Sequence, residues 1–157
     1  MSAKKGRIAQ AADEQNRVVI APGDRKAFGF ASVAEQEEMR ARADGPPFVV
    51  LKYYRAAFEC FSHWTAEELK LFSSFIGKLR DVDWETTQRG GFQRKALDLA
   101  KIDATAAGHL RAVKERLSDD ISFFELRVSQ AIRVHGFRAK DAFFLVLLDR
   151  EHRVCPE

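Results

Sequence analysis

Residues 121–155, ISFFELRVSQAIRVHGFRAKDAFFLVLLDREHRVC, constrain the fold more than any other part of the chain. Their aromatic and β-branched content predicts three consecutive strands, at residues 121–128, 131–138 and 142–149. The links at residues 129–130 and 139–141 are too short for parallel crossovers, so we expect antiparallel hairpins. The last strand, AFFLVLL, is apolar on both faces and is therefore expected to be central and covered on both sides.

The elements before this segment complete a small α+β pattern. Residues 48–54 (FVVLKYY) predict a strand, and Thr65 with Glu68 forms a capping box at the start of a helix. The apolar stripe of that helix is Leu69, Phe72, Phe75, Ile76 and Leu79. A second helix is expected at about residues 104–117, after a loop at residues 81–103. This order predicts a small α+β domain with two helices packed on one face of an antiparallel sheet, closed by the three-strand meander.

A domain boundary is expected at residues 45–47 (GPP), because proline and glycine interrupt regular structure there. Residues 1–47 are interpreted as an N-terminal appendage, partly disordered, with a short strand at residues 18–20 and a short charged helix ending near residue 42. Residues 48–157 would form the α+β domain. No apolar stretch reaches the length of a membrane span, so the chain is predicted to be cytoplasmic and not membrane-bound.

Composition excludes little. The net charge of +3 and the pI near 9.0 are compatible with nucleic-acid binding, but acids balance bases along the chain. A phosphate-binding surface must therefore come from how the fold groups its charges. Cys60 and Cys155 form no CxxC motif and are expected to be free thiols. No Walker loop, GxGxxG or GxSxG motif is present, and no cofactor is predicted.

The first two strands of the meander place polar residues at a period of two. If their apolar residues point towards the helices, then Arg127, Arg133, His135 and Phe137 share the outer face. Guanidinium groups bind phosphate in bidentate fashion, histidine exchanges protons near neutral pH, and a phenyl ring can stack on a base. The alternative is structural: Glu125 pairs with Arg133 across the strands, and His135 is a half-buried side chain with its hydrogen bonds satisfied.

The C-terminal segment DREHRVCPE is a second group of candidate residues. His152 and Arg153 are candidates for a general acid–base or phosphate-contact role, and the alternative is a solvated, charged turn. The spacing of histidine, cysteine and acidic residues matches no established zinc pattern, so no metal is predicted. Cys60 and His63 are expected to stabilise the start of the first helix and not to act as a nucleophile and its base.

The segment FFELRVSQAIRVHGFRAKDAFFLVLLDREHRV resembles the C-terminal meander of the RelE/ParE toxin superfamily, and most closely its HigB-like, phage-derived branch. The resemblance implies a toxin that cleaves mRNA in the ribosomal A site without a metal, and that a cognate antitoxin protein neutralises. It assigns catalytic roles to Arg127, on the ELRV motif, to Arg133, on the following strand, and to His152 and Arg153, at the basic C-terminal end.

Four further residues of the meander and its last turn are candidates for substrate binding: His135, Phe137, Arg138 and Lys140. Two functions compete with the endoribonuclease. One is a non-enzymatic interaction protein on the same fold, such as a topoisomerase inhibitor or a phage accessory or defence-related binding protein. The other is a nucleic-acid-binding protein without catalysis, whose affinity would fall steeply with salt.

Overall fold

A computed structural model describes residues 45–89 and 91–156 of the 157-residue chain. These residues comprise the predicted α+β domain. The predicted strand at residues 18–20, the predicted charged helix ending near residue 42, and the appendage up to residue 44 lie outside the described residues.

The domain is built on a five-stranded sheet with the strand order β1-β5-β4-β3-β2. Its strands are β1 (Phe48–Val50), β2 (Lys95–Ala96), β3 (Phe123–Arg127), β4 (Arg133–Ala139) and β5 (Ala142–Asp149). Strands β3, β4 and β5 pair antiparallel in succession, which confirms the predicted meander. Strand β1 pairs parallel to β5, so the sheet is mixed and the prediction of a wholly antiparallel sheet is wrong.

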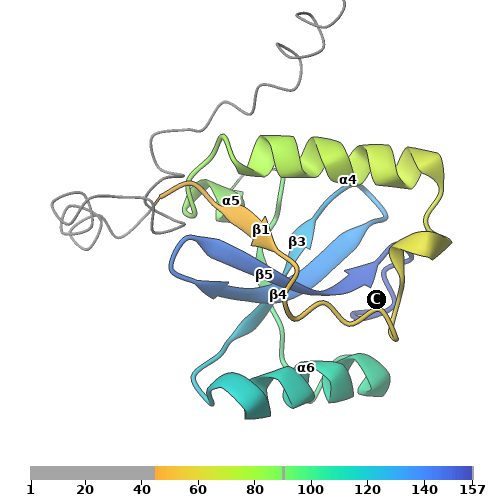
Figure 1. Ribbon diagram of the computed structural model, residues 1–157, viewed down its shortest axis with the longest axis vertical. Helices are drawn as coiled ribbons and strands as arrows, with labels where there is room; N and C mark the ends of the chain where they lie inside the picture. The colour runs from red at the N-terminus through yellow and green to blue at the C-terminus, as the bar shows by residue number, and fades with distance from the viewer. Residues whose placement is uncertain (1–44, 90, 157) are drawn as a thin grey trace, which may run out of the picture. The chain divides into compact units, whose positions relative to one another are not determined.

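Helices cover both faces of this sheet. Figure 1 shows α4 (Ala66–Leu79) on one side of the strands and α6 (Ala104–Leu117) on the other. A 3-10 turn, η1 (Phe61–His63), precedes α4, and the short helix α5 (Thr86–Arg89) follows it. The prediction that both helices pack on one face is therefore wrong. The two-sided cover agrees instead with the apolar character of β5 on both of its faces.

Local sequence explains where the two long helices begin. The Thr65 hydroxyl accepts a hydrogen bond from the Glu68 N–H at 3.2 Å, and the Glu68 carboxylate accepts one from the Thr65 N–H at 2.8 Å. This is the predicted capping box. In α6 the Asp103 carboxylate plays the N-cap role and accepts a hydrogen bond from the Ala106 N–H at 2.9 Å.

Each face of the sheet has its own apolar core. On the α4 face the core includes Phe72, Phe75, Leu79, Trp84, Phe124, Leu126, Val134, Phe143 and Leu145. On the α6 face it includes Leu110, Val113, Phe123, Phe137, Val146, Leu147 and Val154. Two residues of the predicted α4 stripe, Leu69 and Ile76, remain 38% and 39% exposed, so the buried face of α4 is narrower than the sequence pattern.

A β-bulge interrupts β5. His135 lies opposite Leu147 while the adjacent Gly136 lies opposite Leu145, so Val146 is the additional residue on β5. Before the bulge Leu145 points towards α4, and after it Leu147 points towards α6. The bulge thus reverses which side of the sheet the side chains after Val146 point to. As a result, Asp149 lies on the same face as His135.

Gly136 is required by this close strand approach. A Cβ at this position would lie 2.0 Å from the Phe144 carbonyl oxygen on the neighbouring strand. We expect Gly136→Ala to lower the free energy of unfolding by about 2 kcal/mol, because the strands must separate to admit the methyl group. Urea unfolding measures the change.

Gly108→Ala on α6 is the matched control, because a Cβ there meets no atom within 4 Å. It should stabilise the protein by up to about 1 kcal/mol, as alanine favours a helix over glycine. Equal effects of the two substitutions would contradict the explanation given for Gly136.

Within residues 45–89 and 91–156, no helix is long and apolar enough to span a membrane.

Candidate functional site

A polar pocket of about 430 Å³, called here the basic pocket, lies over the β2–β3–β4 part of the sheet. Its lining comprises Gln88, Gln93, Arg94, Lys95, Glu125, Arg127, Arg133, His152, Cys155 and Pro156. Three of the four residues predicted to be catalytic, Arg127, Arg133 and His152, meet here. Its volume lies within the range of small-ligand sites.

The β3–β4 hairpin sets the two arginines side by side. Arg127 and Arg133 are directly opposed in the antiparallel register, on the face of the sheet that α6 covers further along. Like charges in directly opposed positions are destabilising unless an anion lies between or beside them. Lys95 on β2 lies opposite Glu125 in the same way. Three cationic side chains thus converge around one carboxylate.

The two arginines differ in how they are held. Arg133 is buried, and its Nη1 donates hydrogen bonds to the carbonyl oxygens of Ser129 at 2.8 Å and of Gln130 at 3.0 Å. Arg133 therefore braces the β3–β4 turn as well as lining the basic pocket. Arg127 is half-buried, and its Nε is buried without a hydrogen-bond partner among the described residues.

Glu125 adds a second unsatisfied group to the same pocket. Its side chain is 6% exposed, and its Oε2 has no hydrogen-bond partner among the described residues. Buried polar atoms are nearly always paired in folded proteins. An unpaired guanidinium nitrogen and an unpaired carboxylate oxygen in one pocket are the arrangement expected where a polar ligand supplies the missing partners.

Asp149 fixes the C-terminal wall of the basic pocket. Its carboxylate is fully buried and accepts hydrogen bonds from His135 Nε2 at 3.1 Å, from the Val154 N–H at 3.0 Å and from the Arg153 N–H at 2.6 Å. Burial opposes ionisation, but these three hydrogen bonds outweigh it and lower the pKa of Asp149 below its ordinary value. The turn they define holds His152 with a positive φ of 57°.

His135 is a structural partner of Asp149. Its ring is fully buried, and because ionised Asp149 can only accept, His135 Nε2 carries the donated proton. Of the two interpretations of this strand, the one that places His135 and Phe137 on an open outer face is wrong, since α6 and the C-terminal segment cover that face. Phe137 is 4% exposed and stacks on Phe144 with ring centroids 4.9 Å apart, which leaves no open ring face for a base.

Arg138 and Lys140 lie at the opposite end of β4 from the basic pocket. Arg138 lies on the α4 face, with its guanidinium 4.7 Å from the Trp84 ring centroid and its Nε donating to the Lys140 carbonyl at 2.6 Å. Lys140 is exposed in the hairpin turn. Five residues along a strand span about 16 Å. These residues therefore cannot contact the same phosphate as Arg133.

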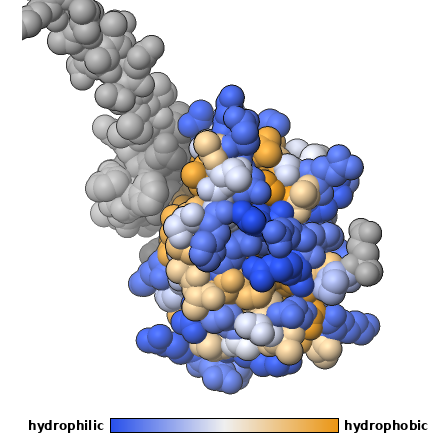
Figure 2. Space-filling model, turned by 90° about the vertical axis from the view of Figure 1, so that its right-hand side faces the viewer, coloured by the Kyte–Doolittle hydropathy of each residue, from blue (hydrophilic) through white to orange (hydrophobic). Residues whose placement is uncertain are grey.

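Arg153 faces away from the basic pocket. Its Nη2 lies 3.4 Å from Glu59 Oε1, and its guanidinium lies 4.9 Å from the Phe58 ring centroid. The buried Glu59 carboxylate also accepts hydrogen bonds from Trp64 Nε1 at 2.8 Å and from the Arg150 N–H at 2.9 Å. Figure 2 shows hydrophilic side chains gathered across the middle of the molecule's face on this side. In the structure Arg153 ties the C-terminal segment to the η1 region.

Sequence reasoning missed Lys95, Gln88 and Gln93, because the sequence predicts only a loop at residues 81–103. They stand on α5, β2 and the turn between them. A two-residue strand leaves no periodicity to detect. Arg94 was missed as well, but its guanidinium lies over the rings of Trp84 and Phe124 on the α4 face.

Among the described residues, no three histidine, cysteine or acidic side chains gather closely enough to hold a metal ion. Comparison of the chain with protein-family models, with curated proteins and with solved structures gives no match. A function for this chain is therefore inferred from the geometry of the basic pocket.

Cys155 lines the basic pocket and Cys60 does not, so their thiol reactivities can be compared. The Ser62 hydroxyl, and next the Ser62 N–H that donates a hydrogen bond of 3.5 Å to the Cys60 Sγ, lower the pKa of Cys60. Burial raises the pKa of Cys155, and the neighbouring Glu125 raises it further. We expect iodoacetamide at pH 7.5 to alkylate Cys60 several-fold faster than Cys155, because the thiolate is the reacting form. Peptide mass spectrometry measures both alkylation rates. Faster labelling of Cys155 would contradict the expected order of the two thiol pKa values.

Proposed function

We propose that this chain is a toxin-type endoribonuclease of the RelE/HigB kind that cleaves mRNA, on the ribosome, without a metal. The observation that carries the proposal is the convergence of Arg127, Arg133 and Lys95 in one pocket with His152 and with Glu125, whose Oε2 has no hydrogen-bond partner among the described residues. These groups match what RNA cleavage by its own 2′-hydroxyl requires: positive charge at the phosphate, a base and an acid.

Each side chain has a role in this chemistry. Arg127 and Lys95 contact the scissile phosphate and stabilise the additional negative charge of the transition state, while Arg133 holds Arg127's strand and adds charge. Glu125 accepts the proton of the 2′-hydroxyl as the 2′-oxygen bonds to phosphorus. The bond from phosphorus to the 5′-oxygen breaks, and His152 donates a proton to that oxygen. The products are a 2′,3′-cyclic phosphate and a 5′-hydroxyl.

The chemistry of the new RNA ends tests this proposal. The full chain is incubated with a defined mRNA, free and on translating ribosomes, and the new 5′ ends are ligated to an adaptor with and without prior kinase treatment. Attack by the 2′-hydroxyl predicts ends that ligate only after the kinase. An mRNA with 2′-deoxy nucleotides at the mapped sites should not be cut there. Ends that ligate directly, or no new ends with folded protein, would overturn the proposal.

One observation favours the competing interaction function. Leu69 and Ile76, seven residues apart on one side of α4, are both more than a third exposed. Exposed apolar side chains on a helix surface are typical of a protein-binding face. A protein partner would contact α4 there, and this function survives if no RNA is cut.

A further inference from the structure

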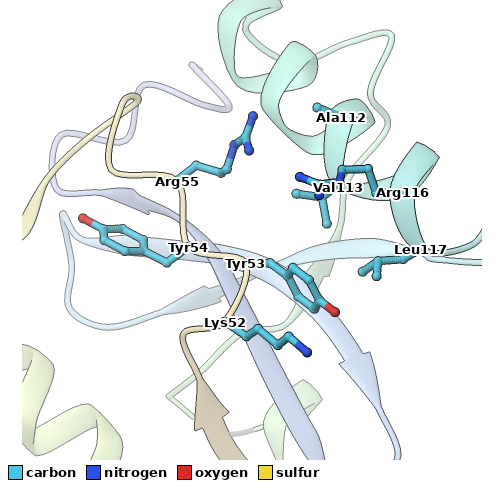
Figure 3. A pocket seen from close by; sticks show the side chains of 8 residues that line it. All are labelled: Lys52, Tyr53, Tyr54, Arg55, Ala112, Val113, Arg116 and Leu117. Carbon is cyan, nitrogen blue, oxygen red and sulfur yellow. The ribbon is translucent and has the colours of Figure 1, made fainter.

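A second pocket, of about 370 Å³, lies at the other edge of the sheet and is called here the Tyr53 pocket. It is lined by Lys52, Tyr53, Tyr54, Arg55, Ala112, Val113, Arg116 and Leu117. Figure 3 shows it between the segment that follows β1 and the C-terminal half of α6. In the sheet order β1-β5-β4-β3-β2 it lies beside the first strands, whereas the basic pocket lies over the last.

The charges of the Tyr53 pocket are all positive. Lys52, Arg55 and Arg116 line it, and its lining holds no carboxylate. Within residues 45–89 and 91–156, the side chains of Arg55 and Arg116 make no hydrogen bond or ion pair. Figure 3 shows Arg55 reaching towards α6 and Arg116 reaching back towards Arg55. Two converging guanidinium groups without a counter-charge are the arrangement expected of an anion site.

The walls of the Tyr53 pocket are held by the core. The Tyr53 ring packs against Phe144 and Phe137, with centroids 5.6 Å and 6.1 Å away. The Arg55 N–H donates a hydrogen bond of 2.8 Å to the carbonyl of Val146, the additional residue of the β-bulge. The backbone that carries Arg55 is thus fixed to the central strand, so ligand binding costs little backbone conformational entropy there.

We propose that the Tyr53 pocket binds a phosphate group of a nucleotide or of a single-stranded nucleic acid. Arg55 and Arg116 hold the phosphate oxygens, and Lys52, whose ammonium lies 5.6 Å from the Tyr53 ring centroid, adds a third charge. The exposed part of the Tyr53 ring provides an apolar wall for the sugar or base. The pocket is larger than a phosphate ion, and a nucleotide uses both the charge and the ring. This site does not depend on RNA cleavage.

Binding of uncleavable probes to the full chain tests the proposal. The probes are adenosine 5′-monophosphate, inorganic phosphate and a fluorescein-labelled 2′-O-methyl RNA of twelve nucleotides, which cannot undergo attack by a 2′-hydroxyl. The variant Arg55→Gln/Arg116→Gln is compared with Arg80→Gln/Arg111→Gln, which removes the same charge from exposed arginines outside both pockets. Neither side chain of the first pair makes a hydrogen bond within the described residues, so the fold should persist, and urea unfolding checks this.

We expect the first variant to bind the RNA about tenfold more weakly and to lower the slope of log K against log salt by about 1.4, for two lost phosphate contacts. The control should retain at least half the affinity of the native chain. If the native chain binds the mononucleotide and the first variant does not, one phosphate with its nucleoside is sufficient for binding. If the native chain binds the RNA but not the mononucleotide, the ligand of the site is a nucleic-acid strand.

Three results would overturn the proposal. Equal losses in the two variants would show that net charge alone attracts the probes. Unchanged affinity in the first variant would remove the site. An acidic peptide that binds more tightly than either nucleic-acid probe, and only when Arg55 and Arg116 are present, would assign the Tyr53 pocket to a protein partner. None of these results depends on whether the basic pocket cleaves RNA.

Discussion

Arg127→Gln is expected to slow RNA cleavage by about 10²-fold to 10³-fold, the usual effect of removing one donor to a charge that develops in the transition state. The free energy of unfolding should change little, because Arg127 is half-buried and its Nε has no hydrogen-bond partner within the described residues. Single-turnover cleavage of a programmed mRNA measures the rate, and urea unfolding measures the stability. A loss of rate without a loss of stability would assign Arg127 to the reaction.

Arg111→Gln is the matched control for this prediction. Arg111 is exposed on α6, where its Nη2 donates to the Leu99 carbonyl at 3.2 Å, and it lines neither pocket. It removes the same charge at an exposed position outside both pockets, so it separates a specific contact from general attraction of RNA. Equal rates for Arg127→Gln and the native chain, with cleavage present, would refute the role of Arg127. Equal losses of cleavage rate in both variants would mean that Arg127 contributes only through the net charge of the protein.

Arg133 is a poorer test of the same site. Its Nη1 hydrogen bonds to the Ser129 and Gln130 carbonyls hold the β3–β4 turn, so Arg133→Gln removes both a pocket charge and a structural brace. Loss of activity in that variant would not distinguish catalysis from folding. The comparison of Arg127 with Arg111 avoids this ambiguity.

The meander was predictable because its signals are local. A period of two sets which residues share a face, and links of a few residues permit only antiparallel neighbours. The side-by-side placement of Arg127 and Arg133 follows from those two rules, and the register confirms it. The capping box at Thr65 was equally visible, since it depends on two residues three positions apart.

The wrong predictions concern contacts between distant segments. The alternation in β4 shows that His135 and Phe137 share a face with Arg133, but not that α6 covers that face. The helix pattern of residues 104–117 predicts an apolar side without naming the surface it meets. The parallel pairing of β1 with β5 is equally invisible, because FVV suits either direction.

The bulge in β5 explains why the role of Asp149 could not be predicted. Its additional residue, Val146, is apolar like its neighbours, so AFFLVLL gives no sign that the facing reverses. Counted at a strict period of two, Asp149 would lie on the α4 face, away from His135. One interpretation of the C-terminal segment is a solvated, charged turn, whereas Val154 is fully buried in the α6-face core.

Asp149→Asn is expected to lower the free energy of unfolding by about 3 kcal/mol, since hydrogen bonds to a charged group contribute about 1.5–3 kcal/mol each. The asparagine amide can accept on one atom only, so its NH₂ group would face one of the donors that Asp149 now satisfies. Asp103→Asn is the matched control, because asparagine is an equally good N-cap and the change should be near zero. Urea unfolding at pH 7 measures both.

The pH dependence separates charge from packing. Because the pKa of Asp149 is lowered in the folded protein, its contribution is fully present above the unfolded pKa of about 3.9 and is lost as the pH falls towards the folded pKa. The stability gap between the native chain and Asp149→Asn should therefore narrow as the pH falls below about pH 4. A gap that stays the same at pH 3 would mean that the asparagine acts through shape alone. Since Asp149 also positions His152 and Cys155, the variant should alkylate faster at Cys155 even where it remains folded.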